Sequence, residues 1–207
     1  MEAVLLFVMV TGSAAGGVLA LKAQSHRLRF PLATVALVLV TFVLSAVGNS
    51  SQSFLDALAR DRSQLLDGEW WRLATPLFVQ DGGWPGTTFN VVSLLVLGSI
   101  VESTFGRRAM LAVYFTAGLV SEAFAYTLLQ GQGFAGNSVA VMGLAGLLTV
   151  ALLRSRILPL PARANGAFAA VAGSLLVATA NLHGVGFAVG VVAAIVVPKR
   201  PFDEGRA

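Results

Sequence analysis

The sequence predicts an all-α polytopic membrane protein, and three observations lead to that fold class. Hydrophobic residues make up 56% of the 207 residues and charged residues only 12%, which is too apolar for a soluble domain with one core. The apolar residues gather into runs of about 15 to 20, close to the ~20 residues that a helix needs to cross a bilayer. The basic residues fall between these runs, so the net charge of +4 indicates membrane topology and no nucleic-acid partner.

Seven apolar runs are predicted to be transmembrane helices. The first is not a signal peptide, because Glu2 stands where a basic segment should be and the positive charges follow the run. We expect it to be an uncleaved extra helix with its N-terminus outside, and Gly12, Gly16 and Gly17 would let it pack closely. The predicted spans are 3–21, 31–48, 88–105, 109–128, 138–153, 166–180 and 182–198.

The positions of lysine and arginine orient these spans. All but three of the basic residues lie in alternate connections, which the positive-inside rule assigns to the cytoplasm together with the C-terminus. The abundance of arginine over lysine, with many Ala, Val and Gly residues, favours a bacterial cell membrane. The cytoplasmic set comprises Lys22, Arg27, Arg29, Arg107, Arg108, Arg154, Arg156, Arg163, Lys199, Arg200 and Arg206.

The connection 49–87 is predicted to be the one sizeable extramembrane element. Apolar and charged residues alternate at helical spacing over 54–66, which predicts a short helix, either lying at the membrane interface or simply solvated. Trp70 and Trp71 suit a membrane–water boundary. The glycines and proline of 81–86 predict a turn that leads into the third span.

Three polar residues are predicted to lie at one depth in the membrane. Asn90, Ser138 and His183 stand near the outer ends of the third, fifth and seventh spans, which all run in the same direction. Polar side chains are costly in hydrocarbon and normally face a protein interior or a wet cavity, so a shared site is the simplest explanation. Each also has a structural alternative: a serine bonded to its own backbone, an asparagine joining two helices, and a solvated histidine.

Two further observations concern charged residues in the membrane and metal or cofactor binding. Glu122 is the one charge well inside a span, where it either has a structural role or lines an access route for water. The chain has no cysteine and no His, Asp and Glu cluster at metal-ligand spacing, so we expect no metal and no organic cofactor.

Four segments carry a family resemblance. They are Gly68–Leu73 (GEWWRL) with Trp71 and Arg72; Asn90 followed by Leu94, Gly98 and Glu102; Gly136–Val139 (GNSV); and His183 with Gly186 and Gly190. In this order, and with this topology, residues 31–198 resemble the rhomboid family of intramembrane serine proteases. The resemblance implies a six-helix rhomboid-like core with one extra N-terminal transmembrane helix. The implied domains are 1–29 for the extra helix and its loop, 30–198 for the membrane domain and 199–207 for a cytoplasmic tail.

The resemblance also assigns roles to individual residues. Ser138 would be the nucleophile and His183 its general base, forming a dyad because no carboxylate occupies an obvious orienting position. Asn90 and the backbone N–H of Ser138 would stabilise the oxyanion. The small residues Gly136, Gly143, Gly186 and Gly190, with Trp71 and Arg72 in the loop, would form the structural motif.

The substrates implied by the resemblance are single-span membrane proteins cleaved near the outer face of the lipid bilayer. Three positions depart from the family pattern: Val139 replaces a glycine, and Gly86 and Gln80 stand where histidines are common. These departures support an alternative, a catalytically impaired rhomboid-like protein that binds membrane clients. A third class, a small transporter or channel subunit, would need mid-membrane polar residues or an internal repeat, and only Glu122 is a candidate.

Overall fold

The described part of the chain consists of helices and their connections, which confirms the predicted all-α class. The computed structural model describes residues 1–24, 30–128, 134–196 and 202. Within these ranges the helices long and apolar enough to cross a membrane are α1 (Glu2–Ala23), α2 (Leu32–Ser50), α5 (Gly83–Phe105), α6 (Arg107–Leu128) and α8 (Leu160–Ala178), and the shorter apolar helices are α7 (Ser138–Arg154) and α9 (Leu182–Val196). Arg27, Arg29, Lys199, Arg200, Arg206 and the predicted tail except Phe202 lie outside the described residues.

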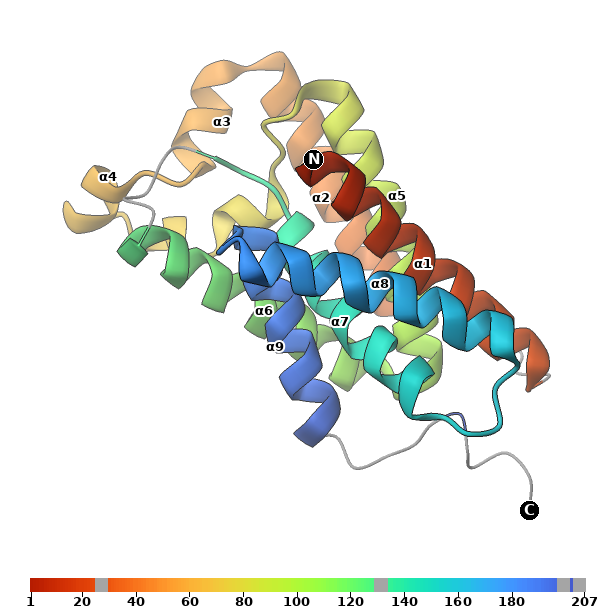
Figure 1. Cartoon of the computed structure of the whole chain (residues 1–207). Helices are drawn as coiled ribbons and strands as arrows, with labels where there is room; N and C mark the ends of the chain where they lie inside the picture. The colour runs from red at the N-terminus through yellow and green to blue at the C-terminus, as the bar shows by residue number, and fades with distance from the viewer. Residues whose placement is uncertain (25–29, 129–133, 197–201, 203–207) are drawn as a thin grey trace.

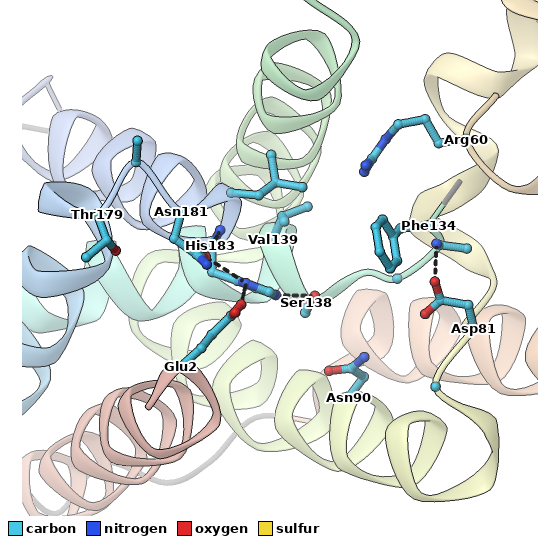
Figure 2. Close-up of a pocket in the computed structure, with 15 residues that line it drawn as sticks. Glu2, Arg60, Asp81, Asn90, Phe134, Ser138, Val139, Thr179, Asn181 and His183 are labelled. Atoms are coloured by element: carbon cyan, nitrogen blue, oxygen red, sulfur yellow. Dashed lines mark hydrogen bonds and ion pairs between the residues drawn. The ribbon is translucent and has the colours of Figure 1, made fainter. Parts of the chain in front are cut away.

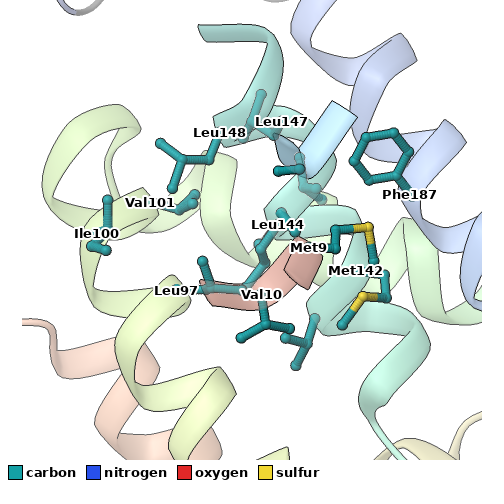
Figure 3. Packing of buried hydrophobic residues seen from close by; sticks show 14 of the residues in the cluster. Met9, Val10, Leu97, Ile100, Val101, Met142, Leu144, Leu147, Leu148 and Phe187 are labelled. Atoms are coloured by element: carbon teal, nitrogen blue, oxygen red, sulfur yellow. The ribbon is translucent and has the colours of Figure 1, made fainter. Parts of the chain in front are cut away.

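Helix α7 lies at the centre of the bundle, with α1, α5, α6, α8 and α9 packed against it (Figure 1). A helix that is apolar on all sides is buried on all sides, and most residues of α7 are buried. The buried core around it draws on α1, α2, α5, α6, α7, α8 and α9. Figure 3 labels part of this core: Met9 and Val10 of α1; Leu97, Ile100 and Val101 of α5; Met142, Leu144, Leu147 and Leu148 of α7; and Phe187 of α9.

Helices α7 and α9 approach each other so closely that their backbones touch. A Cβ atom added at Gly190 would overlap the carbonyl oxygen of Gly143, and one added at Gly186 would overlap the carbonyl oxygen of Val139. Only glycine permits this approach. Small residues at a helix interface let backbones pack together where lipid supplies no hydrophobic driving force.

Helix α1 packs along α8 and also contacts α5 and α7 (Figure 1). Its glycines face these neighbours. A Cβ atom added at Gly12 would lie 2.9 Å from the carbonyl oxygen of Asn165, and one added at Gly16 would lie 3.0 Å from the carbonyl oxygen of Ala162. The expected close packing of this helix is therefore present, and the glycines fix its position against the bundle.

The segment 51–82 forms four short helices: α3 (Gln52–Leu58), α4 (Arg62–Leu66) and the 3₁₀ helices η1 (Trp70–Leu73) and η2 (Thr75–Phe78). The prediction of one helix over 54–66 is wrong, because the chain is extended at Ala59 and restarts at Asp61. The Asp61 carboxylate accepts from the backbone N–H of Gln64 and caps the second helix.

Two long helices begin earlier than predicted. α5 starts at Gly83, inside the predicted turn 81–86, and α8 starts at Leu160 instead of 166. Both first turns contain a proline. The first N–H groups of a helix have no intrahelical partner, so a proline there removes no hydrogen bond and its fixed φ suits the helix.

Helix α2 is capped by a side chain from another helix. It has no side-chain cap of its own. The Glu102 carboxylate of α5 instead accepts from the backbone N–H of Ala33 at 3.1 Å and from the backbone N–H and hydroxyl of Thr34, both at 2.8 Å. This anion satisfies unpaired donors at the helix N-terminus and ties α2 to α5.

Candidate active site

Ser138 is the first residue of α7, and the residues before it are fastened to the segment 51–82. The backbone N–H of Gly136 donates to the carbonyl of Pro76 at 2.9 Å, and the N–H of Ala135 donates to the Asp81 carboxylate at 3.0 Å. The extramembrane segment therefore fixes how the chain enters α7. As a first helical residue, Ser138 has a backbone N–H with no intrahelical acceptor.

The structure brings Ser138 and His183 together from α7 and α9. Ser138 Oγ lies 2.9 Å from His183 Nε2, which is hydrogen-bond distance (Figure 2). Gly186 and Gly190, which make the backbone contacts with α7, lie one and two turns after His183 on α9, and these contacts hold Ser138 and His183 at this distance. The predicted convergence of these two residues at one depth is thus present in the structure.

The other ring nitrogen of His183 faces two oxygen acceptors. Nδ1 lies 3.0 Å from Asn181 Oδ1, which also accepts the His183 backbone N–H at 2.9 Å, and 3.0 Å from Glu2 Oε1 (Figure 2). Because both neighbours of Nδ1 are acceptors, we assign the ring proton to Nδ1, which leaves Nε2 free to accept from the Ser138 hydroxyl. The expectation that no carboxylate orients the histidine is wrong: Glu2 stands there.

Asn90 of α5 lines the same cavity, held by a chain of amides. Its Nδ2 donates to Gln80 Oε1 at 2.6 Å, and Gln80 Nε2 donates to Asn137 Oδ1 at 3.0 Å. Gln80 and Asn137 are buried, so this chain fixes the Asn90 amide at the cavity wall. A Cβ at Gly136 would lie 3.2 Å from Gln80 Oε1, 3.6 Å from Ser138 Oγ and 3.9 Å from Asn90 Nδ2.

The cavity around Ser138 has a volume of about 530 Å³, and polar and apolar residues share its lining. The described lining residues are Glu2, Arg60, Asp81, Gly82, Asn90, Phe134, Ala135, Gly136, Ser138, Val139, Thr179, Ala180, Asn181, Leu182 and His183. A space of this size between helices, with convergent polar groups, has the form of a small-ligand or substrate site.

The departures at Val139 and Gly86 are accommodated without strain. Val139 is helical and buried, and its backbone does not adopt the positive φ that a β-branched residue resists. Gly86 lies one turn before Asn90 on α5, and a Cβ there would meet no atom within 4 Å.

Arg72 of the loop motif is buried and organises the segment 51–82. Its guanidinium donates to the backbone carbonyls of Asp56 at 2.7 Å and Ala59 at 2.6 Å, to the Glu69 carboxylate at 2.6 Å, and to Gln64. Trp71 is half exposed and its indole N–H donates to the carbonyl of Ala57 at 3.3 Å. Arg72 is thus a structural residue that joins α3, α4 and η1, away from the cavity.

Glu122 of α6 is paired with Arg60. The Arg60 guanidinium donates to both carboxylate oxygens, at 2.7 and 2.8 Å, and both side chains are buried. A bidentate pair of this kind supports a structural role for Glu122. The sequence carries no sign of this pair, because 62 residues separate its members and Arg60 stands in a loop with several charges.

Comparison with known proteins gives a consistent result. The sequence model of the Rhomboid domain matches residues 67–200. The chain is 29% identical, over 136 residues or 64% of its length, to the rhomboid protease GluP of Bacillus subtilis (strain 168), of which the match covers 26%. It is also 29% identical, over 131 residues or 62% of its length, to YdcA of the same strain, which is provisionally named a rhomboid protease and of which the match covers 64%. The chain thus spans about a quarter of one relative and just under two thirds of the other.

Proposed function

The chain belongs to the rhomboid family of intramembrane proteases, and from this premise we propose that it is a catalytically active serine endopeptidase. It is a multi-pass membrane protein. The single observation that supports activity best is the distance of 2.9 Å between Ser138 Oγ and His183 Nε2. A serine hydroxyl becomes a useful nucleophile only beside a base, and these two groups have that geometry.

The proposed reaction proceeds through an acyl-enzyme. Ser138 Oγ bonds to the peptide carbonyl carbon while its proton passes to His183 Nε2, and the protonated histidine then gives this proton to the leaving amine as the C–N bond breaks. The Ser138 backbone N–H and the Asn90 amide would donate to the developing oxyanion. Water, activated by the same histidine, then hydrolyses the ester and frees Ser138.

The proposed orientation places the N-terminus outside and the C-terminus in the cytoplasm of a bacterial cell. Helix α7 has 17 residues, about 25 Å of helix against a bilayer core of ~30 Å. Ser138 would therefore lie a few ångströms below the outer surface, deep enough to meet a transmembrane segment and shallow enough for water to reach it.

The proposed substrates are single transmembrane segments that unwind near the outer face. An apolar groove runs between α1 and α5 and is lined by Phe7, Val10, Thr11, Ala14, Trp84, Pro85, Thr88, Phe89, Val92, Ser93 and Val96. Helix α5 contributes to both spaces: Phe89 lines the groove and the next residue, Asn90, lines the Ser138 cavity. A substrate helix lying in this groove would present its unwound end to Ser138.

The test is covalent labelling of the purified full chain by a fluorophosphonate probe. An activated Ser138 attacks phosphorus and displaces fluoride, so we expect labelling that Ser138→Ala and His183→Ala abolish. Ser121→Ala, which removes another buried serine, and His26→Ala, which removes the other histidine, are the matched controls and should label normally.

The outcome separates the enzyme from the client-binding alternative. Labelling that depends on both Ser138 and His183 would support the enzyme. A folded protein that does not label would contradict the proposal and favour a protein that only binds membrane clients. Restoration of labelling by Val139→Gly would then identify that side chain as the cause.

A further inference from the structure

The extra N-terminal helix brings a carboxylate into the candidate active site. Glu2 is the first residue of α1 and lines the Ser138 cavity. Its position is set by packing, since Gly12, Gly16 and Gly17 seat α1 against backbone and side chains of α8, α7 and α5. Helix α1 has 22 residues and runs along the bundle (Figure 1), and Figure 2 shows the Glu2 side chain reaching His183 of α9.

The three side chains form a line of hydrogen bonds. Ser138 Oγ lies 2.9 Å from His183 Nε2, and His183 Nδ1 lies 3.0 Å from Glu2 Oε1. This is the order of nucleophile, base and orienting acid in which each group activates the one before it. The three members come from three different helices, α7, α9 and α1.

We propose that Glu2 is a positioning residue that completes a Ser138–His183–Glu2 triad, with its carboxylate supplied by the extra helix. This inference rests on the proposed protease function. The carboxylate holds the proton on Nδ1, which keeps Nε2 ready to accept. When His183 takes the serine proton and becomes an imidazolium, the negative charge of Glu2 stabilises it, and this interaction is stronger in the transition state than before it.

Asn181 can also orient the His183 ring, but it carries no charge. Its Oδ1 also lies 3.0 Å from Nδ1 and is fixed by the His183 backbone N–H. A neutral amide can orient the ring, but only a carboxylate adds a charge to stabilise the imidazolium. The Glu2 side chain is 52% exposed, so solvent weakens its effect below that of a fully buried acid.

The other charges of the cavity are already engaged. The described charged residues that line it besides Glu2 are Arg60 and Asp81. Arg60 forms the bidentate pair with Glu122, and Asp81 accepts the Ala135 backbone N–H. Glu2 is thus the carboxylate that contacts the His183 imidazole.

The decisive variants are Glu2→Gln and Glu2→Ala in the full chain, with the rate of fluorophosphonate labelling as readout. The maximal labelling rate should fall about tenfold in both, the equivalent of one partly exposed charge-assisted hydrogen bond. The probe concentration that gives half the maximal rate should stay unchanged, because Glu2 does not touch the probe. Asp67→Asn removes an equal charge from an exposed position in the segment 51–82 and should leave both values as in the parent.

The results distinguish the triad from a packing role and from failure of the function itself. If Glu2→Gln and Glu2→Ala both label at the parental rate, Glu2 does not assist His183 and the triad is wrong, although the proposed function stands. If Glu2→Gln is parental and only Glu2→Ala is slow, with a lower melting temperature, the side chain acts by packing and the triad is wrong. Absence of labelling in the folded parent would overturn the proposed function and the triad with it.

Discussion

Gly136 leaves space between Ser138 Oγ and the Asn90 amide, the proposed nucleophile and a proposed oxyanion donor. Its backbone φ is not positive, so the backbone accepts alanine, although the added methyl would lie 3.2 Å from Gln80 Oε1, which must shift slightly. The added methyl would lie 3.6 Å from Ser138 Oγ and 3.9 Å from Asn90 Nδ2, in the space that the proposed reaction gives to the substrate carbonyl oxygen. We expect Gly136→Ala to lower the labelling rate by about 10²-fold, the typical effect of losing one oxyanion donor.

Gly86→Ala is the matched control for this substitution. An added methyl at Gly86 has no atom within 4 Å, although the residue lies on the same helix as Asn90. Equal labelling rates for Gly136→Ala and the parent would show that the oxyanion forms elsewhere. Melting temperatures measured on both variants exclude loss of fold as the cause.

Single residues differ in how far the sequence predicts them. Asn90, Ser138 and His183 could be grouped because the direction of each span and the scarcity of polar residues within spans limit where they can lie. Glu2 could not be placed in the same way, since its position depends on which helices α1 packs against. The glycines of α1 predict close packing but do not say with which partner. Asn181 could have been noticed as a helix-start residue two positions before His183.

At the scale of elements, the contact between α7 and α9 sets the distance between Ser138 and His183. A methyl at Gly190 would overlap the Gly143 carbonyl oxygen and lie 2.9 Å from the Leu147 backbone nitrogen, so the helices must move apart. We expect Gly190→Ala to separate Ser138 from His183 and to lower the labelling rate by at least about 10²-fold. The measurement is the labelling rate, with circular dichroism to show that the helices remain.

The control for Gly190 is a glycine with room for a methyl. An added Cβ at Gly48 of α2 would lie 3.6 Å from Leu55, an ordinary contact, so Gly48→Ala should label as the parent does. A fully active Gly190→Ala variant would contradict the view that backbone contact between α7 and α9 fixes the active-site distance.

The length of each apolar run predicted that a helix would form there, but it predicted the first and last residues of the helices less well. The start of α5 was misplaced because the glycines and proline of 81–86 were interpreted as a turn, whereas a first helical turn accepts a proline. The start of α8, which also has a proline in its first turn, was placed too late, at 166 instead of Leu160. The break at Ala59–Asp61 was missed because apolar spacing alone does not detect a cap. The Glu102 cap on α2 joins residues far apart in the chain, and no local pattern indicates it.

At the scale of the whole molecule, the proposed function assigns substrate entry to the groove between α1 and α5 and the reaction to the Ser138 cavity. Val92 of α5 lines this groove and is 52% exposed. We expect Val92→Trp to fill the groove and to slow cleavage of a single-span test substrate by at least about tenfold, or ~1.4 kcal/mol of transition-state binding. Labelling by the small probe should stay within about twofold of the parent, because the probe needs only the cavity.

Val171→Trp is the matched control for the groove. Val171 is exposed on α8 and does not line the groove. Equal loss of cleavage in both variants would indicate a general effect of a bulky surface residue. Undiminished cleavage by Val92→Trp would show that substrates reach Ser138 by another route.

The overall architecture followed from composition and charge distribution, but the arrangement of the extra helix did not. An N-terminal span can lie at many places on the outside of a bundle, and hydropathy does not distinguish them. The structure seats it on α8 beside α5, where it forms one wall of the groove and reaches the active site. For this reason nothing in the sequence indicated that Glu2 lies beside His183.

Bilayers of different thickness tilt transmembrane helices and alter the way they pack. The glycine contacts between α7 and α9 are made by main-chain atoms, which cannot adapt by changing rotamer. The spacing of Ser138 and His183 should therefore be insensitive to lipid composition. Any dependence of proteolysis on acyl-chain length would then report how a substrate leaves the lipid, and not how its peptide bond is broken.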